Sequence, residues 1–464
     1  MAEAGWATLP DLARRLPPAP SHAQWLTEML ARNRHCAWLR AFGSPATLAD
    51  YRARVPLCSH DDMAPWIARA LAPGARDVLF AGAPVGCERT GGSTSGPKLI
   101  AYSAAGLQDA QRALLPWLAD LAQRHALSGT AYFATSPATR APERVGALPL
   151  GLPDGAWLGP QAGAVLAARS AVPLEVGALT DVAEWRHQTL AHLRAAQDLE
   201  LISVWSPTFL LTLLDDLPDA AALWPRLKLV SCWASGASAR YIPALAERLP
   251  HARIQPKGLL ATEGVVTVPD AHDLPVLTRH GFFEFAQGDS LYLADELRVG
   301  ESYEVVLTNA NGLYRYRLGD HLRCTGFTLA GDPLLELQGR LSLASDLVGE
   351  KLTESFAADC LHPIQGFAML IADADATPPA YRLVCEHPPA PTALAAVEAA
   401  LQRNPQYAYA RRMGQLQATT AWHRPRAWAQ LTQTLLARGT RLADVKPLAL
   451  RGEAAWAMLF RDAG

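Results

Sequence analysis

Short apolar runs typical of strands alternate with helical segments between residues 78 and 231, and this alternation is the strongest constraint on the fold. Residues 178–198 have apolar side chains at helical spacing, and the apolar run 201–205 follows them. A second helical segment at 208–214 precedes the apolar run 227–231. Alternation of this kind is typical of sheets layered with helices. The sequence therefore predicts an α/β fold.

The rest of the chain divides into regions with other patterns. The first 75 residues are predicted to be helical, and the strand-rich residues 282–327 indicate a mostly antiparallel sheet. A chain of 464 residues exceeds the roughly 250–300 residues at which one core stops growing. We therefore expect a large N-terminal α/β domain with a β-rich subdomain, residues 1–343, and a small α+β C-terminal domain, residues 344–464, that acts as a mobile lid.

Further elements follow from local apolar patterns. In the N-terminal domain we expect strands at 78–80, 99–102 and 131–134 and a helix at 104–125. In the C-terminal domain we expect strands at 367–372, 380–386 and 415–421 and helices at 393–403 and 425–437.

Composition excludes several classes of protein. The net charge of −2 implies no general attraction to nucleic acid or membranes, and 50% hydrophobic residues argue against disorder. No apolar run is long enough to span a bilayer, and the N-terminus lacks the pattern of a signal peptide. The seven cysteines are scattered and form no C-x-x-C pair, which fits a reducing compartment. We expect a soluble, cytoplasmic, monomeric protein with no nucleic-acid or membrane partner.

A loop rich in glycine and hydroxyl groups is the most distinctive motif. Its residues are Thr90, Gly91, Gly92, Ser93, Thr94, Ser95, Gly96, Pro97 and Lys98. Glycines allow close approach of the backbone N–H groups to an anion, hydroxyls add donors, and the lysine adds a positive charge. This chemistry suits a polyphosphate, although the same composition alone also fits a surface turn.

The loop is not a Walker A motif. That motif requires lysine directly after its second glycine and then serine or threonine, whereas here Pro97 intervenes and Leu99 follows the lysine. The next residues, 99–102, have a strand pattern where a helix would be required. We therefore expect the loop to join two strands.

Three further motifs contain candidate ligand-binding residues. Thr262 and Glu263 follow a turn, and a carboxylate beside phosphate can hold Mg²⁺; alone, Glu263 also fits a solvated surface residue. Asp320 ends the string LYRYRLGD, and we expect it at a turn that ends a strand, where a carboxylate can accept from two ribose hydroxyls; Asp320 also fits a simple turn-former. The turn formed by Ser235, Gly236 and Ala237 follows a strand, a usual ligand position, although tight turns also need small residues.

Other residues bracket the expected domain boundary. Gly339 and Arg340 precede it, the string Gly349-Glu350-Lys351 follows it, and Lys446 lies near the C-terminus. The chain contains no G-x-S-x-G, H-E-x-x-H or G-x-G-x-x-G motif and no cysteine/histidine cluster with metal-ligand spacing. These absences argue against a serine hydrolase, a zinc protease and a dinucleotide-binding enzyme.

In their order along the chain, these motifs resemble those of the adenylate-forming superfamily. The chain is most similar to the auxin-responsive acyl-acid amido synthetases, often called the Gretchen Hagen family, and their bacterial relatives. The strings that carry the likeness are YRARVPL at 51–57, LYRYRLGD at 313–320 and GEKL at 349–352. The resemblance covers about residues 45–450.

The resemblance implies a role for each motif. The loop from Thr90 to Gly96 would bind the phosphates of ATP, together with Lys98 as a catalytic cation. Ser235, Gly236 and Ala237 would border adenine and the acyl group. Other nucleotide contacts would come from Thr262, Tyr314, Asp320 and Arg340, with Glu263 holding Mg²⁺. Thr262 would also act in catalysis, and Lys446 would neutralise charge at the reacting carboxylate and α-phosphate.

The implied reaction is ATP-dependent. A carboxylate would attack the α-phosphate to form an acyl adenylate and pyrophosphate, and an amino acid or other amine would then form an amide and release AMP. Two alternatives stay open from the sequence, namely thioester formation with coenzyme A and a binding protein whose site has decayed. Trp205 and Trp233 are candidate walls of an aromatic or apolar acyl pocket, although tryptophans more often fill cores.

Overall fold

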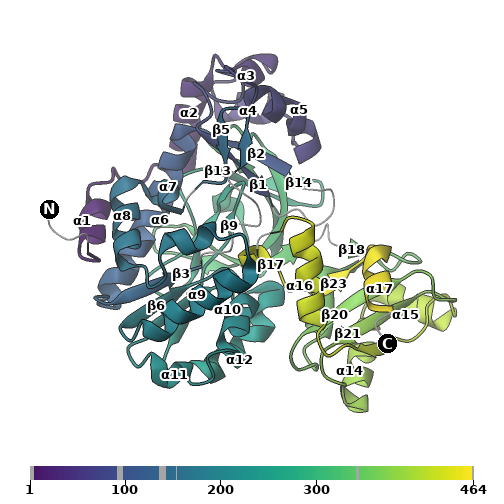
Figure 1. Cartoon of the computed structure of the whole chain (residues 1–464). Coiled ribbons are helices and arrows are strands. Elements are labelled where there is room, and N and C mark those ends of the chain that lie inside the picture. Colours follow the sequence, from purple (N-terminus) through teal and green to yellow (C-terminus); the bar gives the residue numbers. More distant parts are fainter. Residues whose placement is uncertain are drawn as a thin grey trace.

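The computed structural model describes residues 5–90, 98–134, 143–152, 154–340, 344–440 and 442–461. These form two bodies (Figure 1): an N-terminal body, residues 5–340, and a C-terminal body, residues 344–461. Each body has hydrophobic clusters of its own buried residues, and the division into domains at residue 343 stays a prediction. Among the described residues, no helix is both long and apolar enough to cross a membrane.

The N-terminus is helical, as predicted. Its helices are α1 (Thr8–Arg14), α2 (His22–Asn33), α3 (Ala37–Ala41), α4 (Leu48–Arg54) and α5 (His60–Ala70). Ser21 begins α2 with a capping box, in which its hydroxyl accepts from the Gln24 N–H and the Gln24 side chain accepts from the Ser21 N–H. The apolar stripe of α2 is buried in the core that α2 shares with the large antiparallel sheet.

Residues 78–80 do not form the predicted strand. Val78, Leu79 and Phe80 are buried, but they lie in a bend. The carbonyls of Asp77 and Val78 accept from the first N–H groups of α3 at 2.8 and 2.9 Å. These backbone groups are therefore satisfied by a helix start, and the run needs no neighbouring strand.

The glycine-hydroxyl loop joins two strands, as expected. β1 (Gly86–Thr90) and β2 (Lys98–Tyr102) pair antiparallel, and Thr90 lies opposite Lys98. Residues 91–97 lie outside the described residues. The sheet has the order β2-β1-β5-β4, completed by β4 (Glu143–Val145) and β5 (Leu148–Leu150). Only Ser103 separates β2 from helix α6 (Ala104–Arg124), so this helix begins where the hairpin ends.

A parallel sheet forms the α/β part of the N-terminal body. Its order is β3-β6-β7-β8, with β3 (Thr130–Phe133), β6 (Leu199–Ser203), β7 (Leu229–Cys232) and β8 (Arg253–Pro256). The connecting helices are α7 (Asp154–Leu158), α8 (Pro160–Arg169), α9 (Val182–Ala195), α10 (Pro207–Leu214), α11 (Ala220–Leu223) and α12 (Ile242–Arg248), with the 3₁₀ helices η1 (Leu174–Ala178) and η2 (Gly236–Tyr241). The predicted alternation is confirmed.

A seven-stranded antiparallel sheet packs against the N-terminal helices. Its order is β11-β12-β17-β16-β15-β13-β14. The strands are β11 (Thr267–Pro269), β12 (Pro275–Leu277), β13 (Phe282–Gln287), β14 (Ser290–Tyr292), β15 (Ser302–Thr308), β16 (Tyr316–Phe327) and β17 (Pro333–Arg340), with η3 (Ala294–Glu296) between β14 and β15. This sheet is the β-rich subdomain expected from the sequence.

The prediction that Asp320 lies at a turn ending a strand is wrong. It does not end a strand but lies inside β16, opposite Arg340 of β17. Gly319 has a φ of +81°, and the pairing of β15 with β16 shifts register between Glu304 and Val306. A glycine in this conformation allows a bulge within a continuing strand, so the Gly-Asp pair produces a local irregularity rather than a turn.

The C-terminal body has a four-stranded sheet of order β22-β21-β20-β23. Its strands β20 (Ala368–Asp373) and β21 (Ala380–Cys385) and its helices α14 (Pro391–Leu401) and α16 (Ala427–Ala437) match the expected segments, whereas β22 (Thr420–His423) shares only its first two residues with the strand expected at 415–421. The sequence analysis missed α13 (Glu354–Cys360), α15 (Pro405–Arg412), α17 (Ala454–Arg461), β23 (Leu450–Arg451) and η4 (Leu442–Asp444). A short pair, β18 (Ala344–Ser345) and β19 (Leu352–Thr353), lies at the start of this body.

Candidate active site

The parallel sheet brings the two predicted tryptophans together at the carboxyl ends of its strands. Trp205 follows β6 and Trp233 follows β7, and the Trp233 N–H donates to the Trp205 carbonyl at 2.8 Å. Their ring centroids are 5.9 Å apart. Ligands of open α/β sheets bind outside the carboxyl ends of the strands. The two half-buried rings therefore lie where a ligand is expected.

A buried lysine that the sequence analysis did not single out lies beside these rings. Lys257 follows β8, is 4% exposed and donates from Nζ to the Ser203 hydroxyl at 2.6 Å. Its ammonium lies 5.2 Å from the ring of Trp205 and 5.4 Å from that of Trp117 in α6. Cation–π attraction strengthens when the cation is removed from water. One feature of the sequence could have identified Lys257: it lies between a strand and the Gly258 turn that precedes Thr262 and Glu263.

Thr262 and Glu263 are the two residues of a tight hairpin turn. The turn joins β9 (Leu260–Ala261) to β10 (Gly264–Val265), and Ala261 pairs with Gly264. The Tyr102 hydroxyl donates to the Thr262 carbonyl, and Asn309 Nδ2 donates to the Glu263 carbonyl at 2.6 Å. Both turn carbonyls are thus held by side chains, one of them from β2, the strand that follows the glycine-hydroxyl loop.

The electrostatics agree with this arrangement. Glu263 is 6% exposed, and burial raises the pKa of Tyr102 well above its usual value, with the carboxylates of Glu88 and Glu263 adding to the shift. Tyr102 therefore stays a neutral donor toward the Thr262 carbonyl. Strand β2 follows the glycine-hydroxyl loop. Through Tyr102 it contacts the Thr-Glu motif, which lies 160 residues farther along the chain.

The Ser235-Gly236 turn lies against the strand that carries Arg340. Gly236 begins η2 with a φ of +56°, and a Cβ at this position would lie 3.6 Å from the Gln338 carbonyl oxygen of β17. Arg340 lies two residues after Gln338 in β17. It pairs with Asp320 of β16, which is 4% exposed. The fold therefore gathers the small-residue turn, Asp320 and the backbone of Arg340 in one neighbourhood. Ala237 belongs to η2, and the side chains of Ala237 and Arg340 are outside the description.

Lys446 of the C-terminal body reaches the carboxyl edge of the parallel sheet. Its Nζ lies 5.1 Å from the Trp233 ring. Nearby, the Ala449 N–H donates to Glu354 Oε1 at 3.0 Å, and Glu354 is 2% exposed. Burial raises the pKa of Glu354, against the opposing effect of Lys446 and Arg451. The segment that carries Lys446 is thereby tied to α13, at the start of the C-terminal body.

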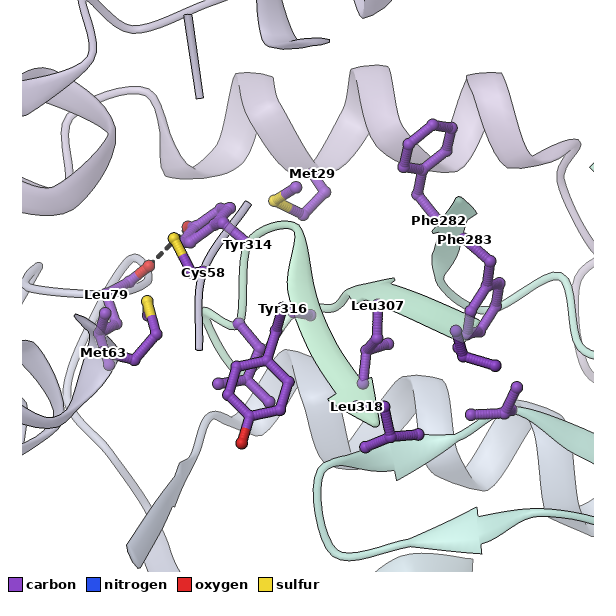
Figure 2. Close-up of a cluster of buried hydrophobic side chains, with 14 of the residues drawn as sticks. Met29, Cys58, Met63, Leu79, Phe282, Phe283, Leu307, Tyr314, Tyr316 and Leu318 are labelled. Atoms are coloured by element: carbon purple, nitrogen blue, oxygen red, sulfur yellow. Dashed lines mark hydrogen bonds between the residues drawn. The ribbon is translucent and has the colours of Figure 1, made fainter. Parts of the chain in front are cut away.

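The predicted nucleotide contact of the Tyr314 side chain is wrong. Tyr314 is 0% exposed, and its hydroxyl donates to the Leu79 carbonyl at 2.6 Å and accepts from Asn33 Nδ2 at 3.1 Å. Its ring stacks on Trp38 with centroids 4.3 Å apart and planes 8° apart. Figure 2 shows it among the apolar side chains of the core, directed at Leu79. A tyrosine bound on its face and its hydroxyl cannot also serve a ligand.

The remaining predicted residues belong to the hairpin loop. The backbone of Thr90 ends β1, and Lys98 begins β2 with a half-buried side chain. Gly91, Gly92, Ser93, Thr94, Ser95 and Gly96 lie outside the described residues. In the described part of the chain no three histidine, cysteine or acidic side chains gather as a metal site.

A small cavity beside the Thr-Glu hairpin is lined by residues of α6, α7, β10 and β15, among others. Its lining includes Asp109, Trp157, Gly264 and His280. Asp109 accepts from Trp25 Nε1 at 3.1 Å and lies 3.5 Å from an Arg112 nitrogen. Burial raises the pKa of Asp109 to about 6 in spite of Arg32 and Arg112. A second depression of about 320 Å³ is also lined by His280 and contains none of the predicted site residues.

We expect Asp109→Asn to stabilise the protein increasingly as pH rises. A carboxyl group whose pKa is raised on folding stabilises the fold when protonated, and this contribution is lost as pH rises through the folded pKa. Raising the pKa from 3.8 to about 6 corresponds to about 3 kcal/mol. The unfolding free energies of the two proteins, measured in urea, should be similar near pH 4 and diverge by about 1–3 kcal/mol at pH 7. A difference independent of pH would contradict this result.

Comparison with known proteins adds two family matches. A model described as the GH3 family N-terminal domain matches residues 17–220, and a model of the GH3 family central domain matches residues 274–340. Together they span more than half of the 464 residues.

Curated relatives align over shorter segments. The indole-3-acetic acid-amido synthetase GH3.8 of Oryza sativa subsp. indica is 33% identical over 148 residues, which are 28% of this chain and 24% of the relative. The jasmonoyl–L-amino acid synthetase JAR6 of Nicotiana attenuata is 38% identical over 96 residues, 18% of this chain and 16% of the relative. The aligned segments thus span a quarter or less of the length of these two relatives.

Solved structures are similar over nearly the whole chain. The AtGH3.15 acyl acid amido synthetase in complex with 2,4-DB superposes with a TM-score of 0.82 at 15% identity, over 100% of this chain and 97% of the other. A 2-hydroxyisobutyryl-CoA ligase in the postadenylation state superposes with a TM-score of 0.53 at 14% identity, over 92% and 97%. At these identities the likeness is one of fold. The two domain matches, in the order of the chain and on this fold, show that the chain belongs to the GH3 family.

Proposed function

We propose that the protein is an ATP-dependent acyl-acid amido synthetase. It activates a carboxylic acid as an acyl adenylate and transfers the acyl group to an amino acid or other amine. The observation that carries the proposal is the position of Lys446, 5.1 Å from the Trp233 ring at the carboxyl edge of the sheet, in a chain of the GH3 family. The names of the relatives support an acid and an amino acid as substrates.

The first step needs groups that stabilise negative charge. When the acid attacks the α-phosphate, charge develops on the phosphoryl oxygens and on the departing pyrophosphate. In this proposal Lys446 and Lys98 supply positive charge, and the Thr262 hydroxyl orients the α-phosphate or the acid. Asp320 binds the ribose hydroxyls. The Ser235-Gly236-Ala237 turn borders the adenine, Arg340 supports Asp320, and the loop 90–96 binds the other phosphates.

The donor set near the hairpin turn fits a magnesium ion. Glu263 is 6% exposed and is the carboxylate of the turn. Mg²⁺ is commonly bound by one or two carboxylates together with substrate phosphates and waters, so a three-residue protein cluster is not needed. In this proposal Glu263 would hold the ion, which would neutralise phosphate charge when bound. The turn carbonyls, held by Tyr102 and Asn309, keep the Glu263 backbone in place.

The acyl group would lie against the tryptophans. Trp205 and Trp233 have ring centroids 5.9 Å apart, which suits a flat or apolar acid. The Trp233 ring lies 5.1 Å from the Nζ of Lys446, the lysine proposed to act on the carboxylate of the acid. We further propose a cytoplasmic location, which is supported by the seven buried, free cysteines.

We expect Asp320→Ala to raise the dissociation constant of ATP about tenfold to a hundredfold, because a charged hydrogen bond contributes roughly 1.5–3 kcal/mol. Titration calorimetry with ATP and Mg²⁺ measures the change. Asp320 is 4% exposed, so Asp320→Asn, which keeps its shape, serves as the second variant. Unchanged affinity in both folded variants would remove Asp320 from the nucleotide site.

The proposed function is tested by ATP–pyrophosphate exchange with a panel of aryl and aliphatic acids and no amine. Exchange that depends on one class of acid would support adenylation. Amino acids, hydroxylamine or coenzyme A, added next, identify the acceptor. Amide formation supports the proposal, whereas thioester formation alone would assign the chain to the coenzyme A ligases. ATP binding without exchange across a broad panel would contradict the proposed activity.

A further inference from the structure

One arginine of the N-terminal body binds three backbone carbonyls of the C-terminal body. Arg240 belongs to η2, which begins at the Ser235-Gly236 turn. Its Nη2 donates to the carbonyls of Ile364 at 2.9 Å and Gly366 at 3.0 Å, and its Nη1 donates to that of Ala368 at 3.1 Å. These carbonyls belong to the turn after α13 and to the first residue of β20.

The contact is specific to the shape of an arginine. A guanidinium offers several donors in a rigid fork, and here that fork spans three acceptors spread over five residues. Burial lowers the pKa of Arg240, against the opposing effect of Tyr241, whose ring lies 5.6 Å from the guanidinium carbon. A lysine has a single nitrogen and cannot reproduce this geometry.

A short path of bonds leads from these carbonyls to Lys446. Ala368 begins β20, and two residues later the Leu370 N–H donates to the Ala449 carbonyl at 2.8 Å. The Ala449 N–H in turn donates to Glu354 Oε1 at 3.0 Å. Lys446 lies three residues before Ala449. Arg240 therefore binds the turn and the start of β20, and β20 is itself bonded to the segment that carries Lys446.

We propose that Arg240 is a positioning residue that holds the C-terminal body in the orientation that places Lys446 at Trp233. The inference rests on the proposed function. Arg240 touches no reacting atom and acts through Lys446. Because Arg240 lies in η2, which begins at Gly236, the same short segment borders the proposed nucleotide site and binds the other body. Loss of the three bonds would leave each body folded and reduce the fraction of molecules in which Lys446 is in place.

The test compares Arg240→Ala, Arg240→Lys and a matched control, Arg248→Ala. Arg248, in α12, also donates to backbone carbonyls, but those of Leu214 and Leu217 in its own body. For Arg240→Ala we expect the maximal rate of ATP–pyrophosphate exchange to fall about tenfold or more, with little change in the KM for ATP. Arg240→Lys should recover only a small part of the loss. Arg248→Ala should keep the normal rate.

Two further readouts separate positioning from a loss of folding. Methylguanidinium, added below denaturing concentrations, should partly restore exchange in Arg240→Ala and have no effect on Arg248→Ala. Hydrogen exchange followed by mass spectrometry should show faster exchange in peptides covering residues 362–373 and 446–451 of Arg240→Ala, with residues 22–70 unchanged. A normal exchange rate in Arg240→Ala, or a loss that methylguanidinium does not restore, would overturn the proposal.

The failure of this inference can be told apart from failure of the proposed function. If no acid supports exchange in the unmodified protein, the function fails, and the hydrogen-exchange comparison still tests the contact between the bodies. If the unmodified protein is active and Arg240→Ala is equally active, only the positioning role fails.

Discussion

Replacing Glu284 by glutamine should lower the free energy of unfolding by about 3–5 kcal/mol. Arg315 donates from Nε to Glu284 Oε2 at 2.8 Å and from Nη2 to Oε1 at 3.0 Å, and the side chains are 7% and 1% exposed. Arg52 Nε lies 3.0 Å from the same carboxylate. Removing the negative charge leaves a buried guanidinium uncompensated, and that penalty exceeds the loss of the pair itself.

The control is an exposed pair in the same sheet. Arg323 Nη2 lies 2.7 Å from Glu336 Oε2, with side chains 48% and 41% exposed. Glu336→Gln should change the unfolding free energy by about 1 kcal/mol or less. Urea unfolding at pH 7 measures both variants. Equal effects would show that the Glu284 carboxylate is no more important to the fold than a surface charge.

The second large effect is expected at Lys446. Lys446→Ala should slow acid-dependent ATP–pyrophosphate exchange by about 10²–10³-fold, a range typical for loss of one group that stabilises transition-state charge. Lys446 is exposed at the carboxyl edge of the sheet, so the unfolding free energy should hardly change. Its contact with Trp233, at 5.1 Å, is weak enough that the change removes little packing.

Two further variants isolate the reason for the loss. Lys446→Arg keeps the charge but not the compact ammonium, so it should recover part of the rate. Arg412→Ala removes an exposed cation of α15 in the same body and should leave exchange unchanged, which controls for net charge. Similar rates for Lys446→Ala and the unmodified protein would remove Lys446 from the proposed mechanism.

The string LYRYRLGD shows how a sequence likeness can be correct while the role of a residue is not. Tyr314 and Arg315 within it are buried, and Arg315 donates to the carbonyls of Arg52 and Val55 at 2.9 and 2.7 Å. Those two residues belong to the other similar string, YRARVPL. The two strings therefore meet in the core and maintain a structural junction, and only Asp320, at the end of the first, stays a candidate for the nucleotide.

The elements predicted from the sequence were those set by local chemistry. Helix α2 has a capping box and an apolar stripe, and α6 follows a serine cap, so both could be placed from residues close together in the chain. The hairpin of β1 and β2 followed from the lack of a helix pattern after Lys98. The run 78–80 was mistaken for a strand because its backbone groups are satisfied by α3, which no local pattern reveals.

The sequence by itself determined the α/β class, the likeness to the family and the motifs proposed to contact ATP, because periodicity and turn residues act over a few positions. Only the tertiary structure decided which of those residues meet. It placed Lys446 at Trp233 and Arg240 on the carbonyls of the C-terminal body, and it buried Tyr314 against Trp38. Such contacts join residues tens to hundreds of positions apart, and they depend on strand order, register and the packing of two bodies, which no single segment encodes.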